Sequence, residues 1–127
     1  MTLKKLDQWR GYLKLGMRCP LEAPEFPRSD CHAFASTPLC HFHTGLAGVR
    51  PSAPFFSEVR IEPAPGGLRA IKTRTPHPKG CVETDLRFDG NGGTAGEVAL
   101  PQGVSGVFVW RGKTVRIEPG RNAIVVE

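Results

Sequence analysis

The sequence has few aromatic residues and no long run of apolar ones. Phe, Trp and Tyr make up 8% of its 127 residues, and only one of them is Tyr. A helix that crosses a membrane takes about 20 mainly apolar residues, and no stretch here approaches that length. Lys4 and Lys5 lie near the start, but no apolar run comes after them as it would in a secretory signal peptide. We therefore expect no membrane partner and a cytoplasmic location.

Cysteine is scarce as well. The four cysteines, Cys19, Cys31, Cys40 and Cys81, fit no disulfide framework of a secreted protein, and no Cys-x-x-Cys pair occurs. We therefore expect reduced thiols, as in a cytoplasmic protein.

Two short runs of Cys and His could suggest zinc. They are Cys31-His32 and Cys40-His41-Phe42-His43. Zinc requires four ligands that converge on one point. Adjacent residues on a helix point about 100° apart, so one such run does not readily chelate an ion. We expect no metal and no cofactor.

The positive charge is not concentrated in one place. Lys and Arg outnumber Asp and Glu by 17 to 12, a net charge of +5. Most basic residues have an acidic neighbour, as Arg60 has in Glu58 and Glu62. Only the first residues have an excess of positive charge, from Lys4, Lys5, Arg10, Lys14 and Arg18. This pattern indicates a solvated surface, and we expect no nucleic-acid partner.

Glycine and proline, by contrast, are abundant, with 15 and 12 residues. Together they form about a fifth of the chain and predict many turns, which favours short strands over long helices. From residue 55 onward, apolar and polar residues alternate as on strands that bury one face. The expected strands cover residues 58–62, 68–75, 82–88, 98–100, 104–110, 114–117 and 123–126.

Turn signals separate these strands. Residues 89–93, Asp-Gly-Asn-Gly-Gly, give the strongest signal, and residues 76–80 form a second hairpin connection. Residues 104–110 are apolar on both faces, which predicts a central strand. About seven short antiparallel strands predict a β-sandwich. The inward-facing residues of one strand are Val82, Thr84, Leu86 and Phe88.

The first 50 residues are unlike the rest. Leu3, Leu6, Trp9, Leu13 and Leu15 form a rough helical stripe, with Thr2 as a cap and Gly16 as the end. Residues 19–27 hold three prolines and predict an irregular loop.

A second helix is expected to begin near Cys31, with Ser29 and Asp30 as the N-cap pair. Pro38 must kink it, or restart it with Thr37 as a new cap. Gly45 and Gly48 supply the C-terminal stops. Two helices cannot enclose an apolar centre, so they pack on the sandwich or belong to a larger helical domain. The fold class is thus mainly β, a sandwich preceded by two short α-helices.

One run of residues resembles a known family. Residues 19–34 read Cys-Pro-Leu-Glu-Ala-Pro-Glu-Phe-Pro-Arg-Ser-Asp-Cys-His-Ala-Phe, and Gly48-Val49-Arg50-Pro51 follows the helix. This order of a Glu-containing loop, an Arg-Ser-Asp-Cys-His-Ala run and a kinked helix resembles the bacterial α-L-rhamnosidases of glycoside hydrolase family 78. The resemblance runs from about Leu15 to the end of the chain.

The resemblance implies that residues 1–50 are the end of an (α/α)₆ barrel and that residues 51–127 are a C-terminal β-sandwich. It also implies inverting hydrolysis of a terminal α-L-rhamnoside, by two carboxyl groups about 6.5–9.5 Å apart. Glu22 matches the general base, ten residues before His32, and the general acid lies upstream in the barrel. His32 and Phe34 match residues that contact the sugar.

The sequence departs from the family at two places. Cys19 stands where a Thr is usual. Phe34 stands where a Trp is usual, and Phe lacks the N–H that Trp can donate. Glu25 is a local rival of Glu22 for the base, and an ordinary solvated carboxylate is the alternative interpretation of either residue. Phe55, Phe56 and Trp110 are expected in the core rather than in a sugar-stacking platform.

Two functions remain open at this stage. The first is a C-terminal fragment of an α-L-rhamnosidase-like hydrolase, inactive without its catalytic barrel. A fragment should expose the stripe of Leu3, Leu6, Trp9 and Leu13, and could self-associate through it. The second is a free-standing sandwich module that binds carbohydrate or a partner protein. A third possibility is complementation of an enzyme encoded beside it.

Overall fold

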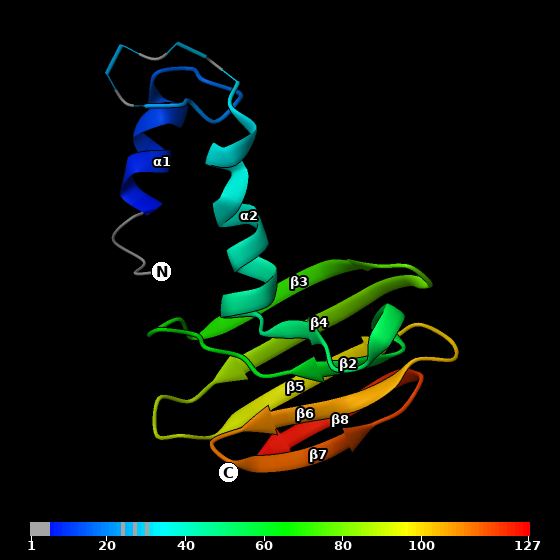
Figure 1. Ribbon diagram of the computed structural model, residues 1–127. Helices are drawn as coiled ribbons and strands as arrows, with labels where there is room; N and C mark the ends of the chain where they lie inside the picture. Colours follow the sequence, from blue (N-terminus) through cyan, green and yellow to red (C-terminus); the bar gives the residue numbers. More distant parts are fainter. Residues whose placement is uncertain (1–5, 24, 27, 30) are drawn as a thin grey trace. The chain divides into compact units, whose positions relative to one another are not determined.

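The computed structural model describes residues 6–23, 25–26, 28–29 and 31–127 (Figure 1). The chain divides into two compact units, residues 1–41 and residues 42–127. Leu3, Thr2 and Asp30, named above for the helical stripe and the caps, lie outside the described residues.

The first unit begins with helix α1 (Leu6–Lys14). Asp7 lies in its first turn, where a negative charge suits the helix dipole, and it pairs with Arg10 at 2.7 Å. The helix buries none of its residues. It ends as expected at Gly16, whose φ of 77° is left-handed and whose N–H donates to the Leu13 carbonyl.

The second helical stretch of this unit starts later than expected. A 3₁₀ turn, η2 (Ala33–Ser36), precedes the short α-helix α2 (Thr37–His41). Pro38 occupies the second position of α2, where its missing N–H costs no hydrogen bond. The prediction of Thr37 as a new cap is wrong, because its hydroxyl donates backward to the Phe34 carbonyl.

The second unit begins with a π-helical turn, η3 (Phe42–Leu46), which is followed by the strands. Gly45 lies inside this turn and does not end it, contrary to expectation. Gly48 does stop it: its φ is 71°, and a Cβ there would lie 1.9 Å from the Glu62 carbonyl oxygen. Only glycine fits this approach, which brings residue 48 against the end of β2.

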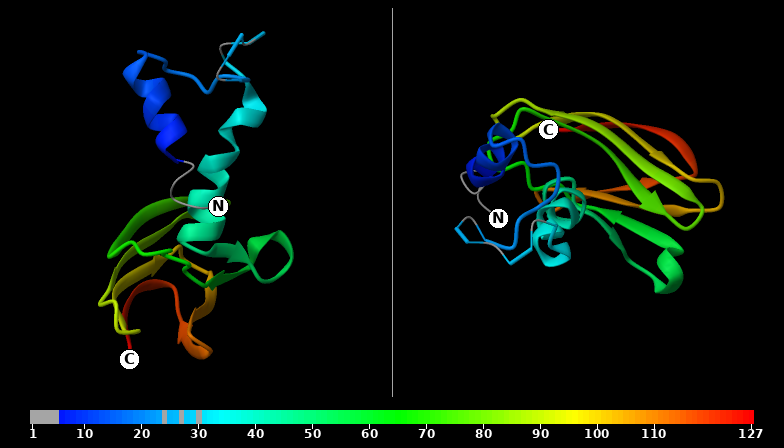
Figure 2. Two further views of the ribbon diagram at one scale, coloured as in Figure 1. Left: turned by 90° about the vertical axis from the view of Figure 1, so that its left-hand side faces the viewer. Right: turned by 90° about the horizontal axis from the view of Figure 1, so that it is seen from above.

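The rest of the second unit is a β-sandwich, as the sequence predicts. Within the described part of the chain, eight strands form two four-stranded sheets, in the orders β1-β2-β6-β7 and β3-β4-β5-β8. The right-hand view of Figure 2 shows these sheets as two facing layers. The strands are β1 (Val49–Pro51), β2 (Glu58–Ile61), β3 (Ala70–His77), β4 (Gly80–Phe88), β5 (Thr94–Leu100), β6 (Ser105–Trp110), β7 (Lys113–Ile117) and β8 (Gly120–Val126).

The core lies between the two layers. Val82, Thr84, Leu86 and Phe88 of β4 all point inward, as predicted. Strand β6 is central in its sheet, also as predicted, and its Phe108 is fully buried. Burial of a side chain this large contributes about 3 kcal/mol to folding. The other fully buried large side chains are Ile61, Ile117, Ile124, Val49, Val59, Val98 and Val104.

Two features of the sheets depart from the prediction. Strand β1 is an extra strand; it pairs with β2 alone, and its Pro51 is tolerated because an edge strand has one unpaired side. Strands β2 and β6 run parallel, so the sandwich is not wholly antiparallel. Gly106 makes this pairing possible, since a Cβ on it would lie 2.0 Å from the Val59 carbonyl oxygen.

Residues 76–77 also differ from the expected connection. Strand β3 extends through His77, which is 8% exposed. The His77 Nδ1 accepts from the Lys79 N–H at 3.0 Å, so its Nε2 carries the proton and donates to the Phe56 carbonyl at 2.8 Å. This bond holds Phe56 in a left-handed conformation, with a φ of 59°.

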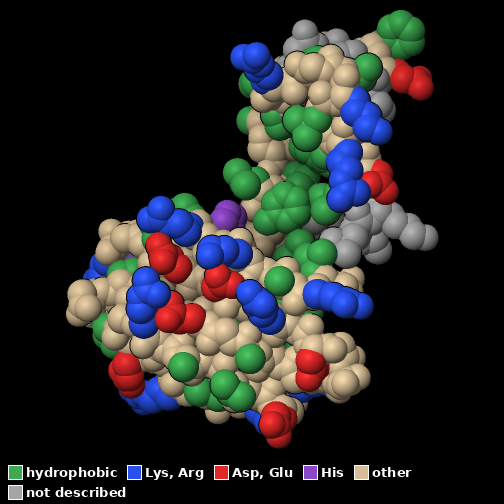
Figure 3. All heavy atoms as spheres, turned by 180° about the vertical axis from the view of Figure 1, so that it is seen from behind, with side chains coloured by type: hydrophobic (Ala, Val, Ile, Leu, Met, Phe, Trp, Pro, Cys, Tyr) green, Lys and Arg blue, Asp and Glu red, His purple; other side chains and the backbone are tan. Residues whose placement is uncertain are grey.

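The surface of the sandwich carries paired charges. Figure 3 shows basic and acidic side chains interspersed over one face. Three ion pairs cross between neighbouring strands of the second sheet: Lys72 with Asp85, Arg74 with Glu83, and Arg121 with Glu97. Exposed pairs of this kind stabilise a fold only weakly. Among the described residues, no helix is long and apolar enough to cross a membrane.

Candidate functional site

The loop that carries Glu22 is tied to the segment before η2 by two backbone hydrogen bonds. The Glu22 N–H donates to the Ser29 carbonyl at 3.2 Å, and the His32 N–H donates to the Pro20 carbonyl at 2.8 Å. Leu21, between them, is 7% exposed and anchors the loop. The pairing therefore brings Glu22 and His32 together although ten residues separate them.

The Glu22 carboxylate is held by Arg28. Its Oε2 accepts from the Arg28 backbone N–H at 3.1 Å and from Nε at 3.3 Å, and its Oε1 accepts from Nη2. The Arg28 side chain lowers the pKa of Glu22, and the nearby His32 lowers it further. The Glu22 side chain is 19% exposed and that of Arg28 is 87% exposed. Glu22 is thus an ionised, mostly covered carboxylate whose cationic partner lies in solvent.

The rings of His32 and Phe34 lie next to each other. Their ring centroids are 5.6 Å apart, with the planes tilted by 50°. His32 is half-buried, whereas Phe34 is 84% exposed. The two rings place an imidazole beside an open apolar surface, which is what a sugar hydroxyl and an adjoining C–H face require.

The remaining candidates of this unit do not form a site. Glu25 is exposed and has no hydrogen bond or ion pair to another described residue. The thiols of Cys19 and Cys31 interact, and this hydrogen bond raises the pKa of Cys31. No disulfide links the cysteines. No set of three or more His, Cys, Asp or Glu side chains in the described ranges could hold a metal ion.

The aromatic residues of the sandwich divide into two kinds. Phe56 packs partly buried against the core, as expected, and so does Trp110, although part of its side chain stays exposed. Phe55 does not: it is 97% exposed, with a left-handed φ of 57° in the 3₁₀ turn η4 (Pro54–Phe56). The alternation of residues could not reveal this, because Phe55 lies in a turn rather than in a strand.

Solved structures with the same fold are known. The α-L-rhamnosidase of Aspergillus terreus matches 93% of this chain with a TM-score of 0.78, at 20% identity. The α-L-rhamnosidase of Dictyoglumus thermophilum matches 87% with a TM-score of 0.70, at 19% identity. The α-L-rhamnosidase of Streptomyces avermitilis, complexed with L-rhamnose, matches 94% with a TM-score of 0.73, at 16% identity.

The chain has the fold of a segment of the α-L-rhamnosidases. It spans 15% of the length of the Aspergillus and Streptomyces enzymes and 16% of the Dictyoglumus enzyme. No protein-family model matches the sequence, and no curated protein matches it. The likeness to the α-L-rhamnosidases therefore rests on the path of the backbone, and it includes most of both units of this chain.

Proposed function

We propose that this chain is the C-terminal part of an α-L-rhamnosidase-like inverting glycoside hydrolase, and that it is inactive without the rest of the enzyme. The observation that supports this best is the match of 93% of the chain to 15% of a solved α-L-rhamnosidase. A match of that extent takes in residues of both units, which supports assigning them to one enzyme.

In this proposal Glu22 is the general base. Its lowered pKa keeps it ionised, and an ionised carboxylate can take a proton from the water that attacks the anomeric carbon. His32 binds a sugar hydroxyl, and Phe34 contacts the sugar ring. A carboxylic acid elsewhere in the enzyme protonates the leaving oxygen, since inversion takes two such groups on opposite faces of the sugar.

Arg28 has to release one carboxylate oxygen for this chemistry. A carboxylate with both oxygens bonded to one guanidinium has fewer lone pairs to offer to water. The exposed Arg28 side chain can rotate away more easily than the covered Glu22 can move. We therefore propose that Arg28 holds the base in position before substrate binds and turns aside when the sugar is present.

The first experiment tests inactivity. Purified chain is incubated with 4-nitrophenyl α-L-rhamnoside, beside a Glu22→Gln variant. We expect the same background rate from both, because one of two carboxyl groups cannot reproduce the roughly 10⁶-fold acceleration that is the lower range for enzymes. Turnover by the chain that disappears in Glu22→Gln would contradict the proposed inactivity.

The second experiment tests the assignment to a larger enzyme. DNA upstream of the coding sequence should encode a helical barrel that can be expressed joined to this chain. We expect the joined protein to release β-L-rhamnose first, as followed by proton NMR, and to lose at least about 10³-fold in kcat on Glu22→Gln. The absence of an encoded barrel, release of the α-anomer, or full activity of Glu22→Gln would each overturn part of the proposal.

A further inference from the structure

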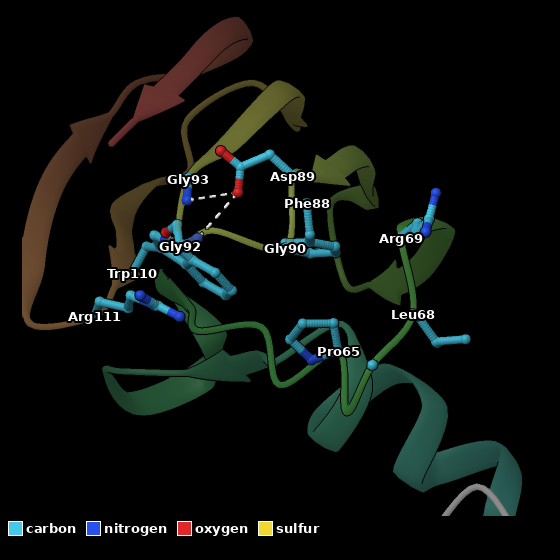
Figure 4. Close-up of a pocket in the computed structure, with 11 residues that line it drawn as sticks. Pro65, Leu68, Arg69, Phe88, Asp89, Gly90, Gly92, Gly93, Trp110 and Arg111 are labelled. Carbon is cyan, nitrogen blue, oxygen red and sulfur yellow. Dashed lines mark hydrogen bonds between the residues drawn. The ribbon is translucent and has the colours of Figure 1, made fainter.

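A cavity of about 530 Å³ opens at one end of the sandwich, and none of Glu22, His32 and Phe34 lines it. Three connections line it: residues 65–69 before β3, residues 89–93 between β4 and β5, and the start of the β6–β7 turn (Figure 4). Binding sites for small molecules measure about 300–1,000 Å³, so the volume suits a ligand of one or two sugar rings.

The apolar part of this cavity comes from aromatic rings. Trp110 and Phe88 lie with their ring centroids 5.1 Å apart, and Pro65 borders the same space. The Trp110 Nε1–H donates to the Gly92 carbonyl at 2.6 Å, which fixes the indole in one orientation. Trp110 remains half-buried rather than covered. A fixed and partly open indole is a platform for the C–H face of a sugar ring.

The turn beside the rings is held rigid by Asp89. Its Oδ1 accepts from the backbone N–H groups of Asn91, Gly92 and Gly93 at 2.8, 3.0 and 2.9 Å. These bonds, that of Asn91 foremost, lower the pKa of Asp89 and keep it ionised. The other oxygen, Oδ2, receives no hydrogen bond from the described residues. Figure 4 shows the bonded oxygen turned to the amides of the turn and the other oxygen turned away from the Trp110 ring.

The cavity has more positive than negative charge. Arg69 and Arg111 both line it, and Asp89 is the acidic residue among the lining. Arg111 lies over Gly92, where a Cβ would meet its Nη1 at 2.1 Å, and its charge also acts on Asp89. Arg69 forms no ion pair or side-chain hydrogen bond with the described residues. An exposed guanidinium with no partner is suited to bind a carboxylate in a bidentate manner.

We infer that this cavity binds an acidic sugar, with the ring on Trp110 and the carboxylate on Arg69, while Asp89 holds the turn that forms one wall. Trp110 would bind the sugar ring and Arg69 the carboxylate. A simple anion would use only Arg69, and a neutral sugar would use only Trp110. This site does not depend on Glu22 or on hydrolysis, so it stands independently of the function proposed above.

The test is an NMR titration of the ¹⁵N-labelled full chain with D-glucuronate. The reporters are the Trp110 indole N–H and the amides of Asn91, Gly92 and Gly93, which lie in or beside the cavity. Trp9 gives the other indole signal, and the spectrum of Trp9→Phe identifies it. We expect saturable shifts at these reporters, and shifts at least about fivefold smaller at equal concentrations of D-glucose or acetate.

The matched variants are Arg69→Gln and Arg116→Gln. Both arginines are exposed, but Arg116 pairs with Glu118 and does not line the cavity. Loss of a charge-assisted hydrogen bond should weaken glucuronate binding about tenfold in Arg69→Gln and leave Arg116→Gln unchanged.

Shifts of equal size with acetate would identify an anion site that does not recognise sugar. Shifts of equal size with glucose would show that the carboxylate and Arg69 do not contribute. Either result would contradict binding of an acidic sugar. The absence of shifts at the reporters would overturn the proposal entirely.

Discussion

Arg28 donates to both carboxylate oxygens of Glu22, through its guanidinium and its own backbone N–H. The two residues are six positions apart on a loop without regular structure. This ion pair therefore helps to hold the loop closed, together with the backbone hydrogen bonds. It has a direct electrostatic consequence. The positive charge favours the ionised form of Glu22, and the pKa of Glu22 falls below its usual value.

Replacing Arg28 by Gln should therefore raise the pKa of Glu22 toward its ordinary value of 4.5. The carboxyl ¹³C signal of Glu22, followed against pH, measures the change. A group whose pKa is lowered by folding contributes stability that is present above its unfolded pKa and lost as pH falls through the folded one. The loop around Glu22 should accordingly loosen in acid in the unchanged chain, whereas Arg28→Gln, which lacks the ion pair at every pH, should show less of this pH dependence.

Arg18→Gln is the control for this substitution, because Arg18 is an exposed arginine of the same unit that does not contact Glu22. In Arg18→Gln, the pKa of Glu22 should equal that in the unchanged chain. An unaltered Glu22 pKa in Arg28→Gln would show that the ion pair does not form in solution.

Gly106→Ala should destabilise the sandwich by about 3 kcal/mol, the upper range for overpacking. The added Cβ would lie 2.0 Å from the Val59 carbonyl oxygen, and Val59 is the partner of Gly106 in the sheet, so neither backbone can give way. Urea unfolding measures the loss. Gly45→Ala is the matched control, since nothing lies within 4 Å of a Cβ there, and it should be neutral or slightly stabilising. Equal stability of both variants would contradict the close β2–β6 pairing.

Cys31 should react slowly with iodoacetamide at pH 8, although it is exposed. The hydrogen bond with Cys19 raises the pKa of Cys31, and only the thiolate is nucleophilic. Substitution Cys19→Ser removes the thiol partner and should speed alkylation several-fold, which mass spectrometry of peptides can follow. Cys81→Ser, in the other unit, should not change the rate. An unchanged rate in Cys19→Ser would mean that the two thiols do not interact.

The exposed leucines of the first unit should make the chain self-associate. Leu13 and Leu15 are 71% and 74% exposed, and apolar side chains gathered on a surface favour association. Light scattering should show a mass that rises with concentration and that Leu13→Glu lowers. Val125 of β8 is equally exposed, at 74%, so Val125→Glu is the control. A decrease with Val125→Glu alone would place the contact on the edge of the sandwich instead.

Local patterns in the sequence were sufficient for much of the sandwich. The alternation around Val82 and Leu86 fixes which face of β4 is inside, and the glycines of residues 89–93 fix the hairpin. These features depend on neighbours in the sequence. The parallel pairing of β2 with β6 depends on residues far apart, so no local pattern could reveal it. Strand β1 was missed because three residues ending in proline carry no periodicity.

The candidate sites divide in the same way. Glu22, His32 and Phe34 came from a resemblance, and their roles stay predictions until activity is measured. Arg28 stood within the same run of residues, but its bond to Glu22 depends on how the loop turns back. The cavity at Trp110 had no signal in the sequence, because three separate connections meet there only after the sheets have packed.

The pairing of Val59 with Gly106 also joins two strands that leave the ribosome at well-separated times. When residues 58–61 emerge, the strand that completes their sheet has not yet been made. Hairpins from residues 70–100 can close in the meantime, as each strand follows its partner directly. At about 5–20 residues per second, the strand that pairs with Val59 and Ile61 follows several seconds later, and until then these apolar side chains lack the neighbour that completes their sheet.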